Sequence, residues 1–153
     1  MGSMIDSKMW EKLDLGRKVE KASAAISGIS TKTIFTVVGG RVNITALVGE
    51  VATTNLQGQA NALTVGVDPT IGAAGALATG IETNGAVIGT TFSITGNPAE
   101  AAIKNTGVAR GCSAPTIVPA GIITIATAAD STGEMKWTLW YKPVDANAYV
   151  EAA

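Results

Sequence analysis

Short runs of apolar, largely β-branched residues, separated by turn signals, dominate the chain after its first 32 residues. The clearest example is FTVVGGRVNITALVGEV, from Phe35 to Val51, in which two such runs flank Gly39 and Gly40. In the second run apolar residues fall on alternate positions, which is typical of a strand with one buried face. Two consecutive glycines suit a two-residue turn that needs positive φ. We therefore predict a β-hairpin over residues 35–51.

Five further segments carry the same strand signal, and turn signals such as DPT, TNG, VPAG and DSTG separate them. They are Asn61–Val67, Gly75–Glu82, Val87–Thr95, Ile122–Ala128 and Glu134–Pro143. Strands at short, fairly regular spacing without intervening helices indicate a sandwich or a small barrel. The sequence thus predicts a mainly β fold, an antiparallel β-sandwich or small β-barrel, in one domain over residues 32–153.

Composition supports this fold and suggests self-association. The chain has 153 residues, enough for one domain with a real core. Hydrophobic residues make up 46% but aromatic residues only 5%, so we expect a core made mainly of Ala, Val, Ile and Leu. Charged residues make up 15%, below the usual share of about 25%. A surface so poor in charge is suited to contact, and we therefore expect a homo-oligomer.

The segment before Lys32 has a different character. It is rich in charges, and its apolar residues recur at intervals that suit one face of a helix. These residues are Ile5, Met9, Leu13, Val19, Ala22 and Ile26. We interpret the first four residues, MGSM, as a cloning remnant and predict that the rest of residues 1–31 forms a helical arm. Its stripe, with Met9, Trp10 and Leu13, is then expected at an oligomer or shell interface.

The residues that carry most enzyme chemistry are scarce. The chain has no histidine and a single cysteine, Cys112, which removes Ser-His-Asp and Cys-His nucleophile systems and a zinc site. Its carboxylates are scattered singly, without the cluster that calcium needs. We therefore expect no enzymatic activity, no metal and no cofactor. A carboxylate pair for glycoside hydrolysis among Glu50, Glu82 and Glu134 stays open, and Cys112 is expected to be a small buried residue.

Charge and hydropathy exclude further classes of partner. A formal net charge of −1 gives no electrostatic basis for binding nucleic acid or an anionic membrane. No apolar run approaches the roughly 18 residues of a membrane span, and the N-terminus has no apolar stretch typical of a signal peptide. Together with the single cysteine, these features lead us to expect a protein that matures in a reducing cytoplasm.

The stretch KWTLWYKP is the one concentration of aromatic residues. One face of the predicted strand carries Trp137, Leu139 and Tyr141, and the other carries Lys136, Thr138 and Trp140. Because the lysine and the threonine mark the second face as the wetter one, we assign the first face to the core. Trp140 then points outward, and for this residue a contact with a neighbouring subunit or shell is favoured over a carbohydrate-stacking platform.

Three stretches follow one another in a distinctive order: IFTVVGGRVNITALVGEVATT, then VPAGIITI, then STGEMKWTLWYKPVDANAYV. In this order they resemble a widespread group of small structural proteins of tailed bacteriophages. In those relatives an F-T-V-x-G-G-R-V hairpin opens the domain, a V-P-A-G-x-I turn and strand comes later, and a T-G-x-x-x-W-x-x-x-Y-x-P strand closes it. The resemblance covers residues 32–153, and the arm before them matches less well.

The resemblance implies a non-enzymatic virion component. Within that group we expect a capsid decoration, or cementing, protein that assembles as a homo-oligomer, with a trimer favoured. Its expected partners are the phage major capsid protein or other virion proteins, and its expected location is the virion, assembled in the cytoplasm of the bacterial host. The alternative is a receptor- or glycan-binding module of a tail fibre or tail tip, which needs aromatic or polar platforms exposed on loops.

Overall fold

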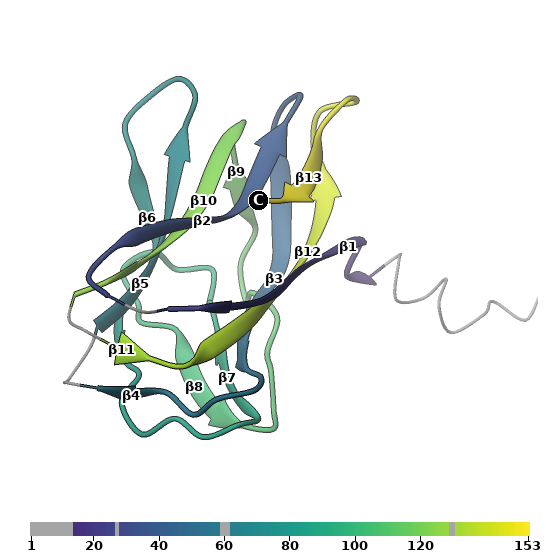
Figure 1. Cartoon of the computed structure of the whole chain (residues 1–153). Helices are drawn as coiled ribbons and strands as arrows, with labels where there is room; N and C mark the ends of the chain where they lie inside the picture. Colours follow the sequence, from purple (N-terminus) through teal and green to yellow (C-terminus); the bar gives the residue numbers. More distant parts are fainter. Residues whose placement is uncertain (1–13, 27, 59–61, 129–130) are drawn as a thin grey trace, which may run out of the picture.

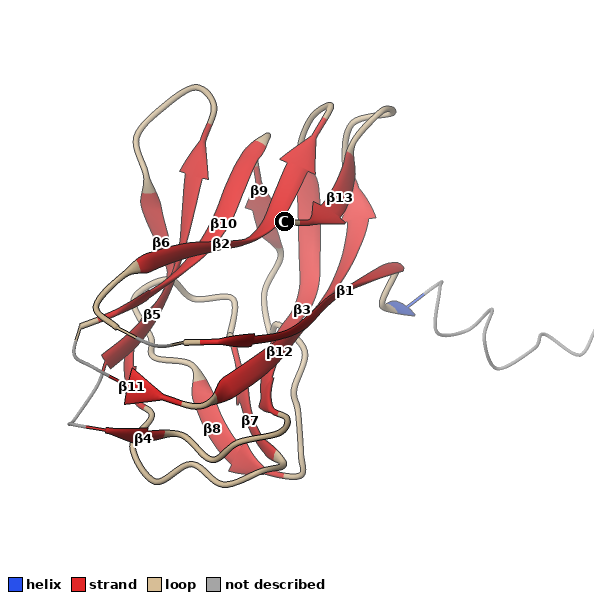
Figure 2. Ribbon diagram, viewed as in Figure 1, coloured by secondary structure: helices blue, strands red, loops and turns tan. Residues whose placement is uncertain are grey.

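Two antiparallel β-sheets lie face to face in the computed structural model of the chain (Figure 1), which describes residues 14–26, 28–58, 62–128 and 131–153. Strands and connecting loops make up almost all of this described part (Figure 2). The two sheets stay separate and do not close into one barrel. The mainly β prediction is therefore confirmed, and of its two architectures the sandwich is the correct one.

The first sheet has the strand order β1-β12-β3-β7-β8, with β9 also paired to β3. Its strands are β1 (Arg17–Ala25), β3 (Val42–Val51), β7 (Thr90–Ser93), β8 (Ile103–Thr106), β9 (Thr116–Val118) and β12 (Glu134–Pro143). β12 lies between β1 and β3, so a late strand joins two early ones. This placement puts the aromatic stretch of the sequence at the centre of a three-strand surface.

The second sheet has the order β13-β2-β10-β5-β6. Its strands are β2 (Thr31–Val38), β5 (Ala62–Pro69), β6 (Gly75–Glu82), β10 (Gly121–Thr127) and β13 (Tyr149–Ala152). A small third sheet pairs β4 (Gln57–Gly58) with β11 (Ser131–Thr132). On one side of the sandwich a bridge joins Thr79 of β6 to Ala101, which lies just before β8 of the first sheet.

The core lies between the two sheets. Leu47 and Leu139 contribute from the first sheet, and Phe35 and Ile123 from the second, all with no exposed surface. The expected preference for small aliphatic residues holds, with a few large rings added. In β12 the core receives Trp137, Leu139 and Tyr141, so the predicted facing of this strand is confirmed.

The predicted hairpin over residues 35–51 is wrong. β2 pairs with β10 and β13, whereas β3 pairs with β12, β7 and β9, so the chain crosses from one sheet to the other at Gly39 and Gly40. Both glycines do have the expected positive φ, 77° and 149°. A side chain on Gly39 would collide with the carbonyl oxygen of Asn147, at 2.3 Å. The glycine pair thus fits a tight crossing packed against the β12–β13 loop.

The predicted helical arm is also wrong over its second half. Arg17–Ala25 is strand β1, whose Val19 lies opposite Leu139 of β12. The register of β1 on β12 therefore decides the structure of this segment, against the helical spacing of its apolar residues. The first half of the predicted arm lies outside the described residues. No helix in the described part of the chain is long and apolar enough to cross a membrane.

Candidate functional site

The outer side of β1, β12 and β3 carries the one aromatic residue that the sequence placed outside the core. Strand pairing brings Lys18 of β1, Trp140 of β12 and Ala46 of β3 into one row across the sheet. The neighbouring rows add polar and charged residues on the same side. We call this surface the Trp140 face and define it by Lys18, Glu20, Val48, Glu50, Lys136, Thr138 and Trp140.

Two ion pairs lie on the Trp140 face. Lys18 Nζ is 2.9 Å from Glu20 Oε1, and Lys136 Nζ is 3.2 Å from Glu50 Oε2. The hydrogen bond and the charge of Lys18 lower the pKa of Glu20. Exposed pairs of this kind add little to stability. Their effect here is to leave the face locally neutral, so that a second surface can approach it without a large electrostatic penalty.

The middle of the Trp140 face is buried. Thr138 lies opposite Val48, and each is only 8% exposed. The sequence had taken Thr138 as a sign of a wet surface, which is wrong for this residue although its side of the sheet was assigned correctly. The face therefore has a covered centre between two charged pairs.

On the Trp140 face, the residue with an unsatisfied hydrogen-bond donor is Trp140 itself. Its ring lies 5.8 Å from Lys18 Nζ, within the range of a cation–π contact. Its indole Nε1 atom is buried and has no hydrogen-bond partner among the described residues. A buried tryptophan N–H usually finds an acceptor, and leaving one unmet carries a cost of about 1–3 kcal/mol. An acceptor supplied from outside the described part of the chain would remove that cost.

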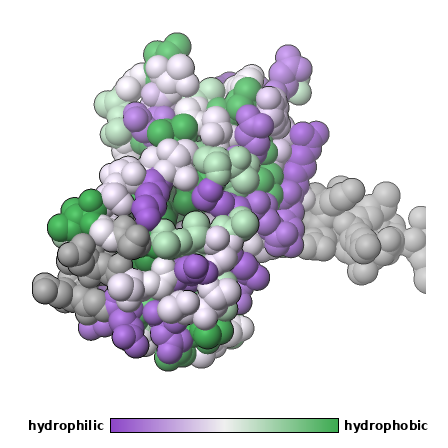
Figure 3. Space-filling view, in the orientation of Figure 1, coloured by the Kyte–Doolittle hydropathy of each residue, from purple (hydrophilic) through white to green (hydrophobic). Residues whose placement is uncertain are grey.

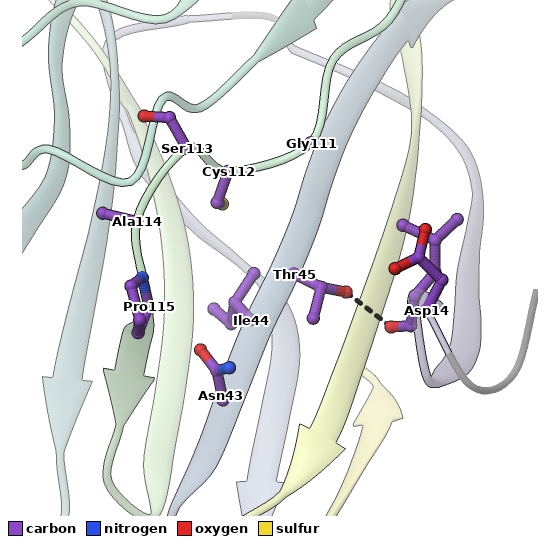
Figure 4. Close-up of a pocket in the computed structure, with 10 residues that line it drawn as sticks. Asp14, Asn43, Ile44, Thr45, Gly111, Cys112, Ser113, Ala114 and Pro115 are labelled. Atoms are coloured by element: carbon purple, nitrogen blue, oxygen red, sulfur yellow. Dashed lines mark hydrogen bonds between the residues drawn. The ribbon is translucent and has the colours of Figure 1, made fainter.

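A pocket of about 340 Å³ adjoins the Trp140 face over β3 (Figure 4). Asp14 and Leu15 border it on one side of the strand, and the segment Gly111–Pro115 borders it on the other. Thr45 Oγ1 donates a 2.5 Å hydrogen bond to the carbonyl oxygen of Leu15, which ties the start of the described chain to β3. The pocket offers few reactive groups to a ligand, because small side chains and backbone groups supply most of its wall.

Three of the reactive residues of the sequence make other contacts in the described structure. Cys112 lines the pocket but is only half-buried, and burial raises the pKa of its thiol, which keeps it in the less nucleophilic protonated form. Glu50 is held by Lys136, and Glu134 accepts hydrogen bonds from Ser23 and Thr53. No group of three potential metal ligands occurs among the described residues.

The predicted interface residues have different outcomes. Trp140 is outward and partly exposed, as expected. Met9, Trp10 and Leu13 lie outside the described residues. Sequence reasoning missed Lys18 and Glu20 as neighbours of Trp140, because it assigned their segment to a helix. Residues 17–21, RKVEK, hold one apolar residue among four charged ones, so this segment carried no clear strand signal.

Exposed apolar residues elsewhere do not form a competing site. Figure 3 shows apolar side chains in small, separate groups among polar ones on the face turned to the viewer. The exposed large apolar residues of the described chain are Ile29, Ile71, Val87, Ile88, Val108, Ile117, Val144 and Tyr149. Most of them belong to turns and loops, and single exposed apolar residues are normal on protein surfaces.

Comparison with known proteins adds no relative. No family model, no curated protein and no solved structure matches this chain. The likeness to phage structural proteins therefore rests on the three sequence motifs alone.

Proposed function

We propose that this chain is a non-enzymatic structural protein of a bacteriophage virion. It acts as a capsid decoration protein that assembles as a homo-oligomer, with a trimer favoured, and attaches to the major capsid protein or to other virion proteins. It joins the virion in the cytoplasm of the bacterial host. The observation that carries the proposal is the partly exposed ring of Trp140 on the outer side of the first sheet, away from the core.

Trp140 and the residues around it suit association with a neighbouring subunit or with the shell. Tryptophan is enriched at protein interfaces and often dominates their binding energy. Around Trp140 the charges of Lys18 and Glu20 already compensate each other, so a partner meets a locally neutral surface and has to supply only apolar contact to the ring. Each such contact is small, but symmetry in an oligomer or shell repeats it, and the repeated contacts raise the overall avidity.

The phage part of the proposal has a separate support in the sequence motifs. They lie on β2–β3, on β9–β10 and on β12, so they include the middle strands of both sheets. Their aromatic positions in the last motif, Trp137 and Tyr141, are core residues. Trp140 is not a motif position. The resemblance therefore concerns the core of the domain and gives no support of its own to Trp140 as the contact residue.

The test uses the virus that encodes the chain. Purified particles are analysed by mass spectrometry and cryo-electron microscopy, and particles that lack the protein are incubated with the purified chain. We expect saturable binding to the outside of the particle, and weaker binding of Trp140→Ala. A particle whose map and protein content lack this chain would rule out the virion role.

A second candidate, glycan or receptor binding at a tail fibre or tip, is favoured by one observation. Trp140 is an aromatic ring bordered by the polar groups of Lys18 and Glu20, a combination that suits stacking on a sugar. Against it, the ring lies on a sheet and not on a loop, and Lys18 lies close to the ring. Binding to a glycan array that is abolished by Trp140→Ala, without binding to phage heads, would favour this candidate.

A further inference from the structure

The outer side of the second sheet has an uncharged centre. Along β10 every second residue points away from the core and is half-buried. Strand pairing adds residues of β2 and β5 to the same side, because residues directly opposite each other have side chains on the same side of a sheet. We call this surface the Thr124 face and define it by Thr33, Thr36, Thr64, Ile122, Thr124 and Ala126. The three strands lie next to one another in the middle of the sheet (Figure 1).

Carboxylates lie at the rim of the Thr124 face. Asp68 and Glu151 lie at the two ends of one row across the sheet, and Glu82 lies at the end of β6. The Trp140 face, on the other sheet, has four charged residues around its centre instead. β-branched residues are common on exposed strands, but this preference applies equally to both sheets. An uncharged centre within a charged rim is typical of a surface that another protein surface covers.

The polar groups of the Thr124 face are hydroxyls, which can both donate and accept a hydrogen bond. Thr64 Oγ1 donates a 3.4 Å hydrogen bond to the carbonyl oxygen of Ala126. The hydroxyls of Thr33, Thr36 and Thr124 have no hydrogen-bond partner among the described residues. Two such surfaces can satisfy each other, because each hydroxyl can take either role. A charged surface would instead lose its water here without gaining an opposite charge.

We propose that the Thr124 face docks onto the same face of a second copy of this chain, related by a twofold axis. A twofold interface uses one patch on both subunits, so the patch has to be complementary to itself, and an uncharged hydroxyl surface meets this condition. Its side chains are small, which lets two sheets pack face to face about 10 Å apart. The contact is separate from the one proposed at Trp140, which lies on the outer side of the other sheet.

The size of the second sheet sets the expected strength of this contact. Its five strands, at the length of the seven-residue β10, form a face of roughly 20 Å by 23 Å, or about 450 Å² per copy. Stable interfaces bury about 800 Å² per partner, and weaker ones bury less. We therefore expect the two faces to pair at hundreds of micromolar, a higher concentration than association through Trp140 requires.

Sedimentation equilibrium of the full chain from tens to hundreds of micromolar tests the proposal. The mass should double over this range, from three chains to six, or from one to two where the contact at Trp140 does not form. Thr33→Lys/Thr124→Lys puts like charges on both faces and should keep the lower mass throughout. The matched control is Thr54→Lys/Thr106→Lys, which changes two exposed threonines away from the Thr124 face and should double in mass as the wild type does.

A rescue experiment guards against loss of folding. Thr33→Glu/Thr124→Glu should also fail to pair alone, whereas its equimolar mixture with Thr33→Lys/Thr124→Lys should pair at least tenfold more tightly than either variant, and added salt should weaken that pairing. A wild-type mass that stays constant, equal losses in the lysine variant and its control, or no pairing in the mixture would overturn the proposal. A constant mass of three chains in both the wild type and the lysine variant would do so while leaving the contact at Trp140 intact.

Discussion

At the level of single residues, Trp137 and Trp140 show how two like side chains on one strand can have unlike roles. Trp137 is 2% exposed and packs in the core, whereas Trp140 lies on the opposite side of β12 with an unpaired indole N–H. Gly49 makes room for the first ring, since a Cβ atom there would lie 2.7 Å from Trp137 Cη2. The strand thus couples a packed side to a side that is available for contact.

Replacing each tryptophan by alanine should separate these roles. Trp137→Ala is a large-to-small core change and should lower the free energy of unfolding by about 3–5 kcal/mol. Trp140→Ala should leave the thermal transition nearly unchanged and weaken association with a neighbouring subunit or the particle. Thermal unfolding and sedimentation of both variants provide the measurements. The reverse pattern, in which only Trp140→Ala unfolds the protein, would show that the proposed roles are exchanged.

The ion pair of Arg41 with Asp145 predicts a dependence of stability on pH. Hydrogen bonds from the side chain and the backbone N–H of Arg41 lower the pKa of Asp145 from 3.8 to about 2. A group with a lowered pKa stabilises the fold above its unfolded pKa, and this contribution is lost as the pH falls through the folded pKa. The pair should therefore stabilise the protein fully above pH 5 and not at all well below pH 2.

Asp145→Asn tests this dependence. Its melting temperature should lie below that of the wild type at pH 7, and the difference should shrink between pH 4 and pH 2. Glu151→Gln removes one exposed carboxylate from β13 and serves as the control for the loss of a negative charge. A difference between wild type and Asp145→Asn that stays constant down to pH 2 would contradict the assignment.

At the level of secondary-structure elements, alternation within a strand was predictable and the choice of partner was not. The bounds of β6 and β12 agree with the segments predicted from the sequence, Gly75–Glu82 and Glu134–Pro143. The glycine pair at 39–40 gave the positive φ values, but local turn chemistry cannot tell a hairpin from a crossing between sheets. For β1, the helical spacing of the apolar residues in the first 26 positions was the pattern available, and only pairing with β12 shows that the segment is a strand.

Of the candidate site, the residue on β12 was predictable from the sequence, but its neighbours on other strands were not. The facing of β12 gave Trp140 as the outward aromatic residue, because that inference needs only the period of a strand. Its neighbours Lys18, Glu20 and Glu50 come from other strands, so their proximity depends on sheet order and register.

Removal of β1 should destabilise the domain, since this strand covers the edge of β12. Deleting residues 1–25 exposes the unpaired backbone groups of β12 and removes Val19 from the packing against the core. We expect a lower melting temperature and more aggregation than for a chain that lacks residues 1–13 and keeps β1. Equal melting temperatures of the two deletions would show that β1 contributes nothing to the stability of the sandwich.

At the level of the whole molecule, the two sheets are linked on both sides of the sandwich. On one side a bridge joins Thr79 of β6 to Ala101. On the other side Lys32 of β2 donates a hydrogen bond to the carbonyl oxygen of Ala25 of β1, and Lys21 of β1 donates one to the backbone oxygen of Ala153. The outer side of the first sheet, with the Trp140 face, is the surface proposed for contact in the virion.

For the whole molecule we predict self-association. With 15% charged residues and the partly exposed ring of Trp140 on the outer side of the first sheet, the chain should form an oligomer, with a trimer favoured, at tens of micromolar. Light scattering coupled to size-exclusion chromatography measures the mass directly. A monomer at that concentration would count against oligomer formation by the free chain, and Ile71→Ser, a change at an exposed loop position, is the control that should leave the mass unchanged.

The position of β12 between β1 and β3 also determines when the domain can form during synthesis. Neither early strand of the first sheet has its main neighbour until residues 134–143 have been made, and β2 likewise receives β13 only from residues 149–152. Sheets that depend on such distant pairings form slowly. A nascent chain stalled before Glu134 on the ribosome should therefore be open to proteases along its whole emerged length. The sandwich is expected to reach its folded form only after residues 134–152 have left the ribosome, and its first strands depend until then on the protection that the cell gives to unfolded chains.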